Sequence, residues 1–159
     1  TQSGDTYDDF VQITDDSGQI FVEVPSDWND VDTSASSDGN PSIQASPDLE
    51  GDIESTPILG YTAVQFTNFP DLDAVIEQTA AASTGGECQA QAPGDYTDGV
   101  FSGRIQAFVN CGGQDRAWLF VAATPDNGDS YATVIFGQAV TLADVDALQH
   151  AFDTFNTTV

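Results

Sequence analysis

Residue types that commonly carry catalysis are scarce in this sequence. His150 is the only histidine among 159 residues, and Ser102, in "GVFSG", has the surroundings closest to those of a nucleophilic serine. The glycines around Ser102 lack the GxSxG spacing that places a serine on a strained turn for a Ser-His-Asp mechanism. His150 lies four residues after Asp146, so a surface ion pair on one helix face is the simpler expectation. We therefore predict no catalytic residue and no enzymatic activity for this chain.

Acidic side chains are so numerous that they could include a metal site or a catalytic pair. Calcium prefers several closely spaced oxygen ligands, and "DWNDVD" offers Asp27, Asp30 and Asp32. This stretch does not match the spacing of an EF-hand loop. A calcium-binding acidic domain is the alternative hypothesis, with Ca²⁺ as the only candidate cofactor. A hydrolase with paired carboxylates is a distant third, because the sequence marks no pair above the others.

The charge balance excludes several partners. There are 26 Asp and Glu residues against two Lys and Arg, and the net charge is −24. Nucleic-acid binding and attraction to anionic membranes both need cationic groups, which are almost absent here. No apolar run reaches the ~18 residues of a membrane-spanning helix, so we expect no direct membrane insertion. A strongly hydrated surface, typical of a salty habitat or an acidic secreted protein, explains most of the acid.

Three residues are candidates for ligand binding or protein interaction. Trp28 lies in a polar loop beside three aspartates, where it either closes the end of a sheet or lines a groove; we favour the first. Arg104 and Arg116 are the only cationic residues besides His150. Each either pairs with nearby acids, which relieves local repulsion, or anchors an acidic ligand.

Two cysteines bear on the compartment of the protein. Cys88 and Cys111 are the only pair, and in an acidic chain without lysine they predict a disulfide and an extracellular or extracytoplasmic location. A two-cysteine metal site is the rival, disfavoured because there is a single histidine and no CxxC spacing. The chain has no Met and opens on a polar stretch, so we expect a piece of a longer protein whose signal peptide or anchor has been removed.

Hydrophobic periodicity predicts the elements that position these residues. A helix is expected over 70–83, with Leu72, Val75, Ile76 and Thr79 on its apolar stripe. A second is expected over 141–155, with an N-cap pair of Thr141 and Asp144 and a stripe of Leu142, Val145, Leu148, Phe152 and Phe155. Strands are expected over 9–14, 19–25, 42–46, 58–66, 99–111, 116–124 and 131–140.

The faces of these strands predict the layers. In the strand over 58–66, Thr62, Val64 and Phe66 share a face. The strands over 116–124 and 131–140 are apolar on both faces, which requires cover on both sides. We predict a linker over 1–9 and a single α+β domain over 10–159. Its expected architecture is a mainly antiparallel central sheet with helices on both faces, an α/β/α sandwich.

Four segments carry a family resemblance. They are "ITDDSGQIFVEVPSDWNDVD", "PSIQASPDLEGDI", "GECQAQAPGDYTDGVFSGRIQAFVNCGG" and "LADVDALQHAFDTF". The strand leading into "VPSDW", and the cysteines bracketing the Y-x-D-G-x-x-x-G-R run of Tyr96 to Arg104, are the most specific parts. Together they resemble an accessory domain of actinobacterial secreted or membrane-tethered trypsin-like serine proteases. The strand-to-P-x-x-W opening is similar to the PsbP/Mog1-like superfold, an α/β/α sandwich.

The resemblance implies a non-catalytic accessory or sensor module. No catalytic motif carries over, because no protease domain lies in this chain. We expect the neighbouring domain of the same polypeptide, a serine protease, to be its first partner. A protein, peptide or small molecule is the expected ligand.

Overall fold

The computed structural model describes residues 7, 9–51, 56–65, 71–84, 88–113, 116–126, 128 and 131–157. Within these ranges the chain forms strands, two α-helices and one short 3₁₀ helix, Cys111–Gly113. In chain order the strands and α-helices are β1 (Phe10–Thr14), β2 (Ile20–Pro25), β3 (Asp30–Asp32), β4 (Ser42–Ser46), β5 (Ile58–Gln65), α1 (Leu72–Thr84), β6 (Gln89–Ala90), β7 (Gly94–Thr97), β8 (Phe101–Val109), β9 (Ala117–Pro125), β10 (Tyr131–Ala139), α2 (Leu142–Thr154) and β11 (Asn156–Thr157).

An eight-stranded antiparallel sheet is the main layer. Its strand order is β3-β4-β5-β10-β9-β8-β6, with β7 also paired to β8. The central strands β9 and β10 pair antiparallel, as the turn-forming residues between them predict. Both are almost entirely buried, which confirms that their apolar faces are covered on both sides.

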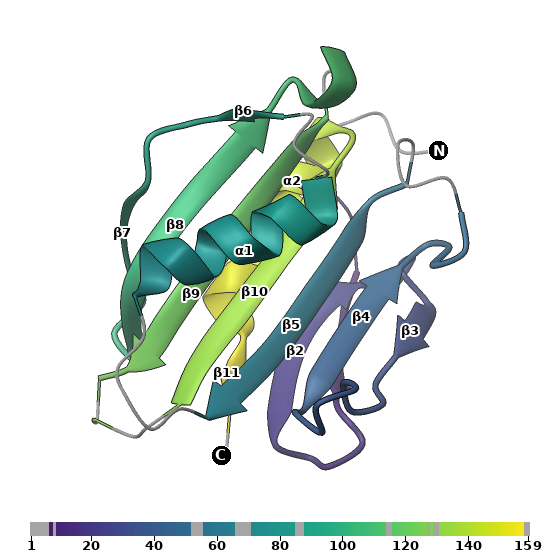
Figure 1. Cartoon of the computed structure of the whole chain (residues 1–159). Helices are drawn as coiled ribbons and strands as arrows, with labels where there is room; N and C mark the ends of the chain where they lie inside the picture. The colour runs from purple at the N-terminus through teal and green to yellow at the C-terminus, as the bar shows by residue number, and fades with distance from the viewer. Residues whose placement is uncertain are drawn as a thin grey trace.

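Different elements cover the two faces of this sheet. On one face, α1 packs its Ile76 and Ala80 against an aromatic cluster of Trp118, Phe120, Phe108 and Phe136. The other face is covered by α2 together with a second, three-stranded sheet of order β1-β2-β11. Figure 1 shows α1 in front of β8, β9 and β10, and α2 behind them.

The predicted α/β/α sandwich is therefore wrong. The described residues are 48% strand and 20% helical, and the architecture is mainly β with large antiparallel sheets. The error arose at the N-terminal hairpin. We took β1 and β2 for part of one central sheet, whereas the buried side chains of β2 face that sheet from a separate layer. Four short segments for which the sequence pattern predicts no strand, β3, β6, β7 and β11, are also strands.

Both predicted helices form, but their buried stripes differ in detail from the prediction. Thr141 and Asp144 form the expected capping box at the start of α2. Leu142, placed on the buried stripe by the sequence pattern, is 76% exposed. The alanines Ala143, Ala147 and Ala151 are buried instead, beside Leu148 and Phe152. Small side chains let α2 approach the sheet closely, so the stripe follows residue size as well as hydrophobicity.

The face of β5 that carries Thr62 and Val64 is the more exposed one. The buried side chains of β5 are Leu59, Tyr61 and Ala63, whereas Val64 is 37% exposed and Thr62 is partly exposed. The core contacts explain this orientation, since Tyr61 meets Phe155, the C-cap residue of α2, edge to face. Phe66, expected on the face of Thr62, lies outside the described residues.

Cys88 and Cys111 form the predicted disulfide. It ties the segment that follows α1 to the end of β8, beside the aromatic cluster under α1. A disulfide indicates an oxidising, extracytoplasmic environment. In the part of the chain that the structure describes, neither α-helix has the length and hydrophobicity needed to cross a membrane.

Gly137 lets α2 lie directly on β10, and this contact gives a test of the fold. A Cβ atom at this position would lie 2.3 Å from Cδ2 of Leu148 and 2.5 Å from the carbonyl oxygen of Ile58. We expect Gly137→Ala to lower the free energy of unfolding by about 1–3 kcal/mol through overpacking, measured by urea denaturation. Gly94→Ala is the matched control, because its Cβ would meet only Ile105 Cγ2, at 3.8 Å. Equal stability of the two variants would contradict this account of the packing.

Candidate functional site

Trp28 is buried in the core and presents no surface to a ligand. Its side chain is 1% exposed, and its indole Nε1 donates a hydrogen bond to the Tyr7 hydroxyl oxygen at 3.2 Å. The two rings meet edge to face, with centroids 5.8 Å apart. The contacts of Trp28 therefore include Tyr7, which lies in the segment that we predict to be a linker.

Asp144 joins this N-terminal segment to the start of α2. Tyr7 donates its hydroxyl hydrogen to Asp144 Oδ1, and Asp144 Oδ2 accepts from the backbone N–H of Val140 and Thr141. Burial, followed by the hydrogen bond to Asp144, raises the pKa of the Tyr7 phenol above its ordinary value. Because the polar groups of Trp28, Tyr7 and Asp144 are hydrogen-bonded to one another or to the backbone, we assign this cluster a structural role.

Arg104 is paired with two carboxylates. It projects from β8 and contacts Asp73 of α1, with Nε to Oδ1 at 2.9 Å, and Asp95 of β7. Its side chain is 30% exposed. The geometry matches the pairing hypothesis for this arginine, since its guanidinium on β8 links α1 and β7, which each supply a carboxylate.

Arg116 is buried, at 6% exposure. Its Nη1 donates to Oε1 of the buried Gln138 at 2.9 Å, and the Gln138 Nε2 donates to the carbonyl oxygen of Thr56. This arginine therefore connects the start of β9 with β10 and the segment leading into β5. A surface ligand would not reach it in this conformation.

The three aspartates proposed for calcium do not converge. Asp30 and Asp32 are two residues apart on the edge strand β3, and Asp30 Oδ2 accepts from the N–H of Leu49. Asp32 accepts from the side chain and the N–H of Ser34, and these hydrogen bonds lower the pKa of its carboxyl group. No group of three or more His, Cys, Asp or Glu side chains suited to a metal ion occurs among the described residues. Calcium binding thus stays a prediction without a defined site.

His150 and Ser102, the two residues considered for catalysis, each contact a carboxylate distant in sequence. His150 contacts Glu23 of β2 across the layer, with Nε2 and Oε1 2.8 Å apart, and stacks on Phe10. We had expected Asp146 as its partner. Ser102 lies in β8 and donates to Asp126 Oδ1 at 2.6 Å. The sequence could not place Glu23 beside His150, because the two are 127 residues apart.

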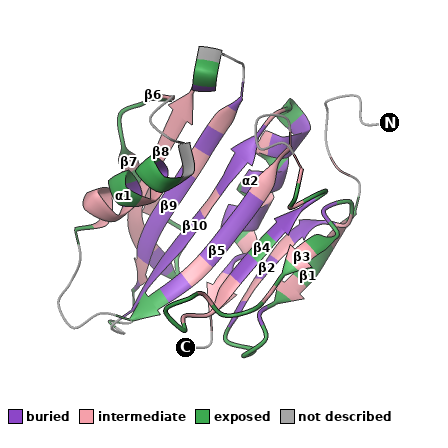
Figure 2. Cartoon of the chain, turned by 45° about the vertical axis from the view of Figure 1, so that its right-hand side comes forward, coloured by how far each residue is buried: buried purple, intermediate pink, exposed green. Residues whose placement is uncertain are grey.

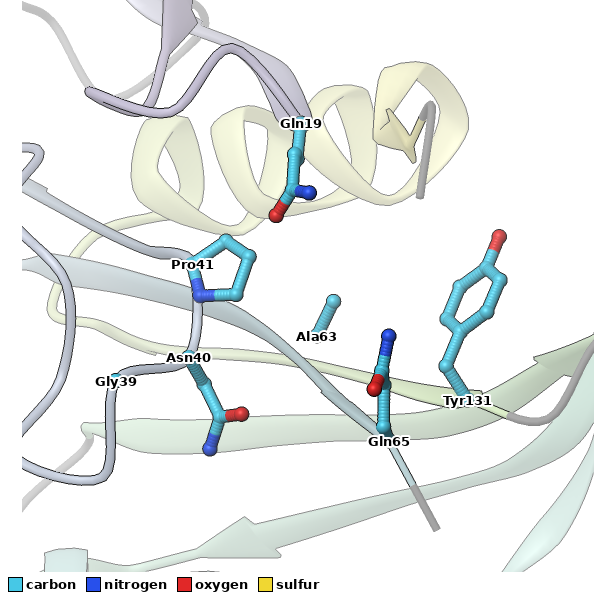
Figure 3. Close-up of a pocket in the computed structure, with 7 residues that line it drawn as sticks. All are labelled: Gln19, Gly39, Asn40, Pro41, Ala63, Gln65 and Tyr131. Atoms are coloured by element: carbon cyan, nitrogen blue, oxygen red, sulfur yellow. The ribbon is translucent and has the colours of Figure 1, made fainter.

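A pocket that the sequence did not predict lies where the β1–β2 turn meets the large sheet (Figure 3). It has a volume of about 170 Å³, and the described residues that line it are Gln19, Gly39, Asn40, Pro41, Ala63, Gln65 and Tyr131. In Figure 3 the amides of Gln19 and Gln65 point into the space between their elements, with Pro41 and Tyr131 on either side and Asn40 turned away. None of these lining side chains is charged.

Three elements position the pocket residues. Gln65 and Tyr131 are opposite each other in the register of β5 and β10. The loop before β4 is held to β5 by Thr62 Oγ1, which donates to the carbonyl oxygen of Pro41 at 2.8 Å. A tight turn closes the same loop, where Gly39 has φ of 83° and its N–H donates to the carbonyl oxygen of Ser36.

Gln19 is positioned by the buried carboxylate of Asp15. Asp15 Oδ1 accepts from the N–H groups of Gln19 and Ile20 at 2.8 and 2.9 Å, and Oδ2 accepts from Ser17. The acidic turn "DDSG" hints at such a bonded loop, but its proximity to β5 and β10 is a tertiary contact that no local pattern reveals. Amide and phenol groups both donate and accept, so the pocket suits an uncharged polar ligand.

Comparison with known proteins provides no independent assignment. No protein-family model matches the sequence. No curated protein matches it either.

Titration of Asp15 gives a test of how the turn is held. Burial acts to raise the pKa of this carboxyl group, but the hydrogen bonds from Ser17, Ile20 and Gln19 outweigh it and the net shift is downward. The stabilisation is therefore complete above the unfolded-state pKa of about 3.9 and is lost as the pH falls through the lower folded value. We expect Asp15→Asn to lower the free energy of unfolding at neutral pH by about 1–3 kcal/mol.

The difference in free energy of unfolding between the native chain and Asp15→Asn should shrink in acid. Urea denaturation of the native chain and of Asp15→Asn, from about pH 7 to about pH 3, measures it at each pH. Asp38→Asn, at an exposed position, is the charge-matched control. A difference for Asp15→Asn that stays constant down to about pH 3 would contradict the proposed role of the carboxylate.

Proposed function

We propose that this chain is a non-enzymatic, extracytoplasmic accessory or sensor module, and that the pocket beside Gln19 and Gln65 binds a small uncharged polar group. The observation that carries the proposal is a hydrogen-bonding pocket whose described lining residues are all uncharged, on a chain of net charge −24. An acidic surface repels anions, so a neutral lining selects ligands that present hydroxyl or amide groups.

The location and context of the module rest on two further supports. The disulfide supports an oxidising compartment. The resemblance to accessory domains of actinobacterial serine proteases supports a secreted or membrane-anchored parent, with a protease domain in the same polypeptide. In that arrangement the module would bind a ligand or position its neighbour, and the chemistry would belong to the neighbour.

The parent reading frame tests the accessory role directly. We expect it to encode a second domain together with a signal peptide or a membrane anchor, which sequencing of the gene and its flanks would show. A reading frame that encodes this domain alone, without an export signal, would contradict the accessory role and leave the pocket proposal to be judged separately.

Ligand titration tests the pocket. We expect N-acetylglucosamine or glycinamide-capped dipeptides to shift the backbone amide signals of Gly39, Asn40 and Gln65 in ¹H–¹⁵N spectra, because these residues line the cavity. Sodium acetate serves as an anionic probe and should produce no saturable shift. The shifts should weaken in Gln65→Ala, which removes one amide from the lining, and persist in Gln44→Ala, at an exposed position on β4.

Two results would contradict the pocket proposal. One is the absence of saturable shifts with either neutral probe. The other is an equal response in Gln65→Ala and Gln44→Ala, which would place any binding elsewhere on the protein.

A further inference from the structure

β1 is an edge strand. It is the terminal strand of the three-stranded sheet, and among the described residues it pairs only with β2, so its outer side has no strand partner there. The bonds from Asp15 N–H to the Ile20 carbonyl oxygen and from Ser26 N–H to the Asp9 carbonyl oxygen mark hydrogen-bonded pairs at its two ends. Because such pairs alternate along an antiparallel ladder, the backbone N–H and C=O groups of Phe10, Gln12 and Thr14 point away from β2.

The residue opposite Phe10 agrees with the outward direction of its backbone groups. Phe10 is opposite Pro25, which has no N–H to contribute to a hydrogen-bonded pair. The next outward group along the chain, the N–H of Asp16, donates to the carbonyl oxygen of Thr33 at 3.0 Å. Within the described part of the chain, the unpaired edge therefore ends before Asp16 and covers the five residues of β1.

This edge lacks the features that usually prevent strand addition. Its sequence, FVQIT, contains no charge, proline or glycine, and is rich in residues that favour strands. Val11 is 43% exposed, and Gln12 and Thr14 are also exposed. The edge strand β3, by contrast, carries Asp30 and Asp32 in three residues. In Figure 2 the β1–β2 hairpin lies at the right-hand side of the molecule, next to β3.

The charges around β1 define the partner. Asp9 precedes the strand and Asp16 follows it, both exposed, so both ends of an uncharged edge are acidic. A second copy of the chain would bring another net charge of −24 to the same edge. A cationic segment would instead be attracted to it.

We propose that β1 binds an extended peptide segment by strand addition, and that the segment alternates apolar and polar residues between flanking Lys or Arg residues. The backbone groups of Phe10, Gln12 and Thr14 supply the hydrogen bonds, Val11 supplies an apolar contact, and the acids at the two ends hold the cationic flanks. This binding does not require the pocket beside Gln65 to be occupied, so either proposal can fail without the other.

Synthetic peptides test the proposal on the native chain. The probe is fluorescein-labelled Lys-Val-Thr-Val-Thr-Val-Lys, and its affinity is measured by fluorescence anisotropy at about 0.15 M salt. A version N-methylated at alternate peptide bonds keeps the charge but loses the edge hydrogen bonds. A version with Glu in place of both Lys keeps the hydrogen bonds but reverses the charge. We expect each change to weaken binding at least about tenfold, and amide shifts to centre on residues 10–14.

Two substitutions at one exposed position separate strand addition from charge alone. Gln12→Pro removes an outward N–H while leaving the ladder to β2 intact, and should abolish binding of the probe. Gln12→Thr keeps the N–H and the strand preference, and should bind as the native chain does. The N-methylated peptide keeps the test decisive even where Gln12→Pro impairs folding.

Two results would overturn the proposal. Equal affinity for the N-methylated and unmodified peptides would show attraction by charge without strand addition. A native chain that sediments as a dimer and is made monomeric by Gln12→Pro, while binding no peptide, would identify a second copy as the occupant of the edge.

Discussion

The antiparallel pairing of β9 with β10, each apolar on both faces, is the constraint on which the rest of the structure depends. A strand pair with two apolar faces is stable only when both are covered, so it requires one layer of α1 and another of α2 with the small sheet. Close approach on the second side also depends on Gly137 and on the alanines of α2. The hairpin of β1 and β2 extends this cover over β4 and β5, since buried side chains of β2 share one core cluster with Ile43 of β4 and Leu59 of β5.

The excess of acid is accommodated by giving many carboxylates local hydrogen-bond donors. Asp15 holds the β1–β2 turn, Asp98 accepts from the N–H groups of Val100 and Phe101 before β8, and Asp144 caps α2. Because cationic side chains are almost absent, backbone N–H groups and hydroxyls replace them as partners. The acidic stretch around Trp28 fits this pattern: the indole is buried, and Asp30 and Asp32 bond to neighbouring backbone and serine groups.

Local sequence patterns predicted the elements better than their arrangement. Both helices, the capping box of Thr141 and Asp144, the disulfide, and the two-sided burial of β9 and β10 follow from periodicity and residue type. The layer of the first hairpin did not, because strands of either sheet show the same alternation. The pocket, the pairing of His150 with Glu23, and the burial of Arg116 are contacts between residues distant in sequence, which no single segment encodes.

Both proposed binding regions belong to the β1–β2 hairpin and its surroundings. Acidic residues are distributed over most of the chain, yet β1 and the described residues that line the pocket beside the β1–β2 turn carry no charge. A hydrated carboxylate opposes desolvation, so a surface that must lose water on binding is easier to form where carboxylates are absent. Asp15 lies between the two regions but does not oppose this argument, because its carboxylate is buried. It accepts four hydrogen bonds from the β1–β2 turn, and one of them holds Gln19 in place.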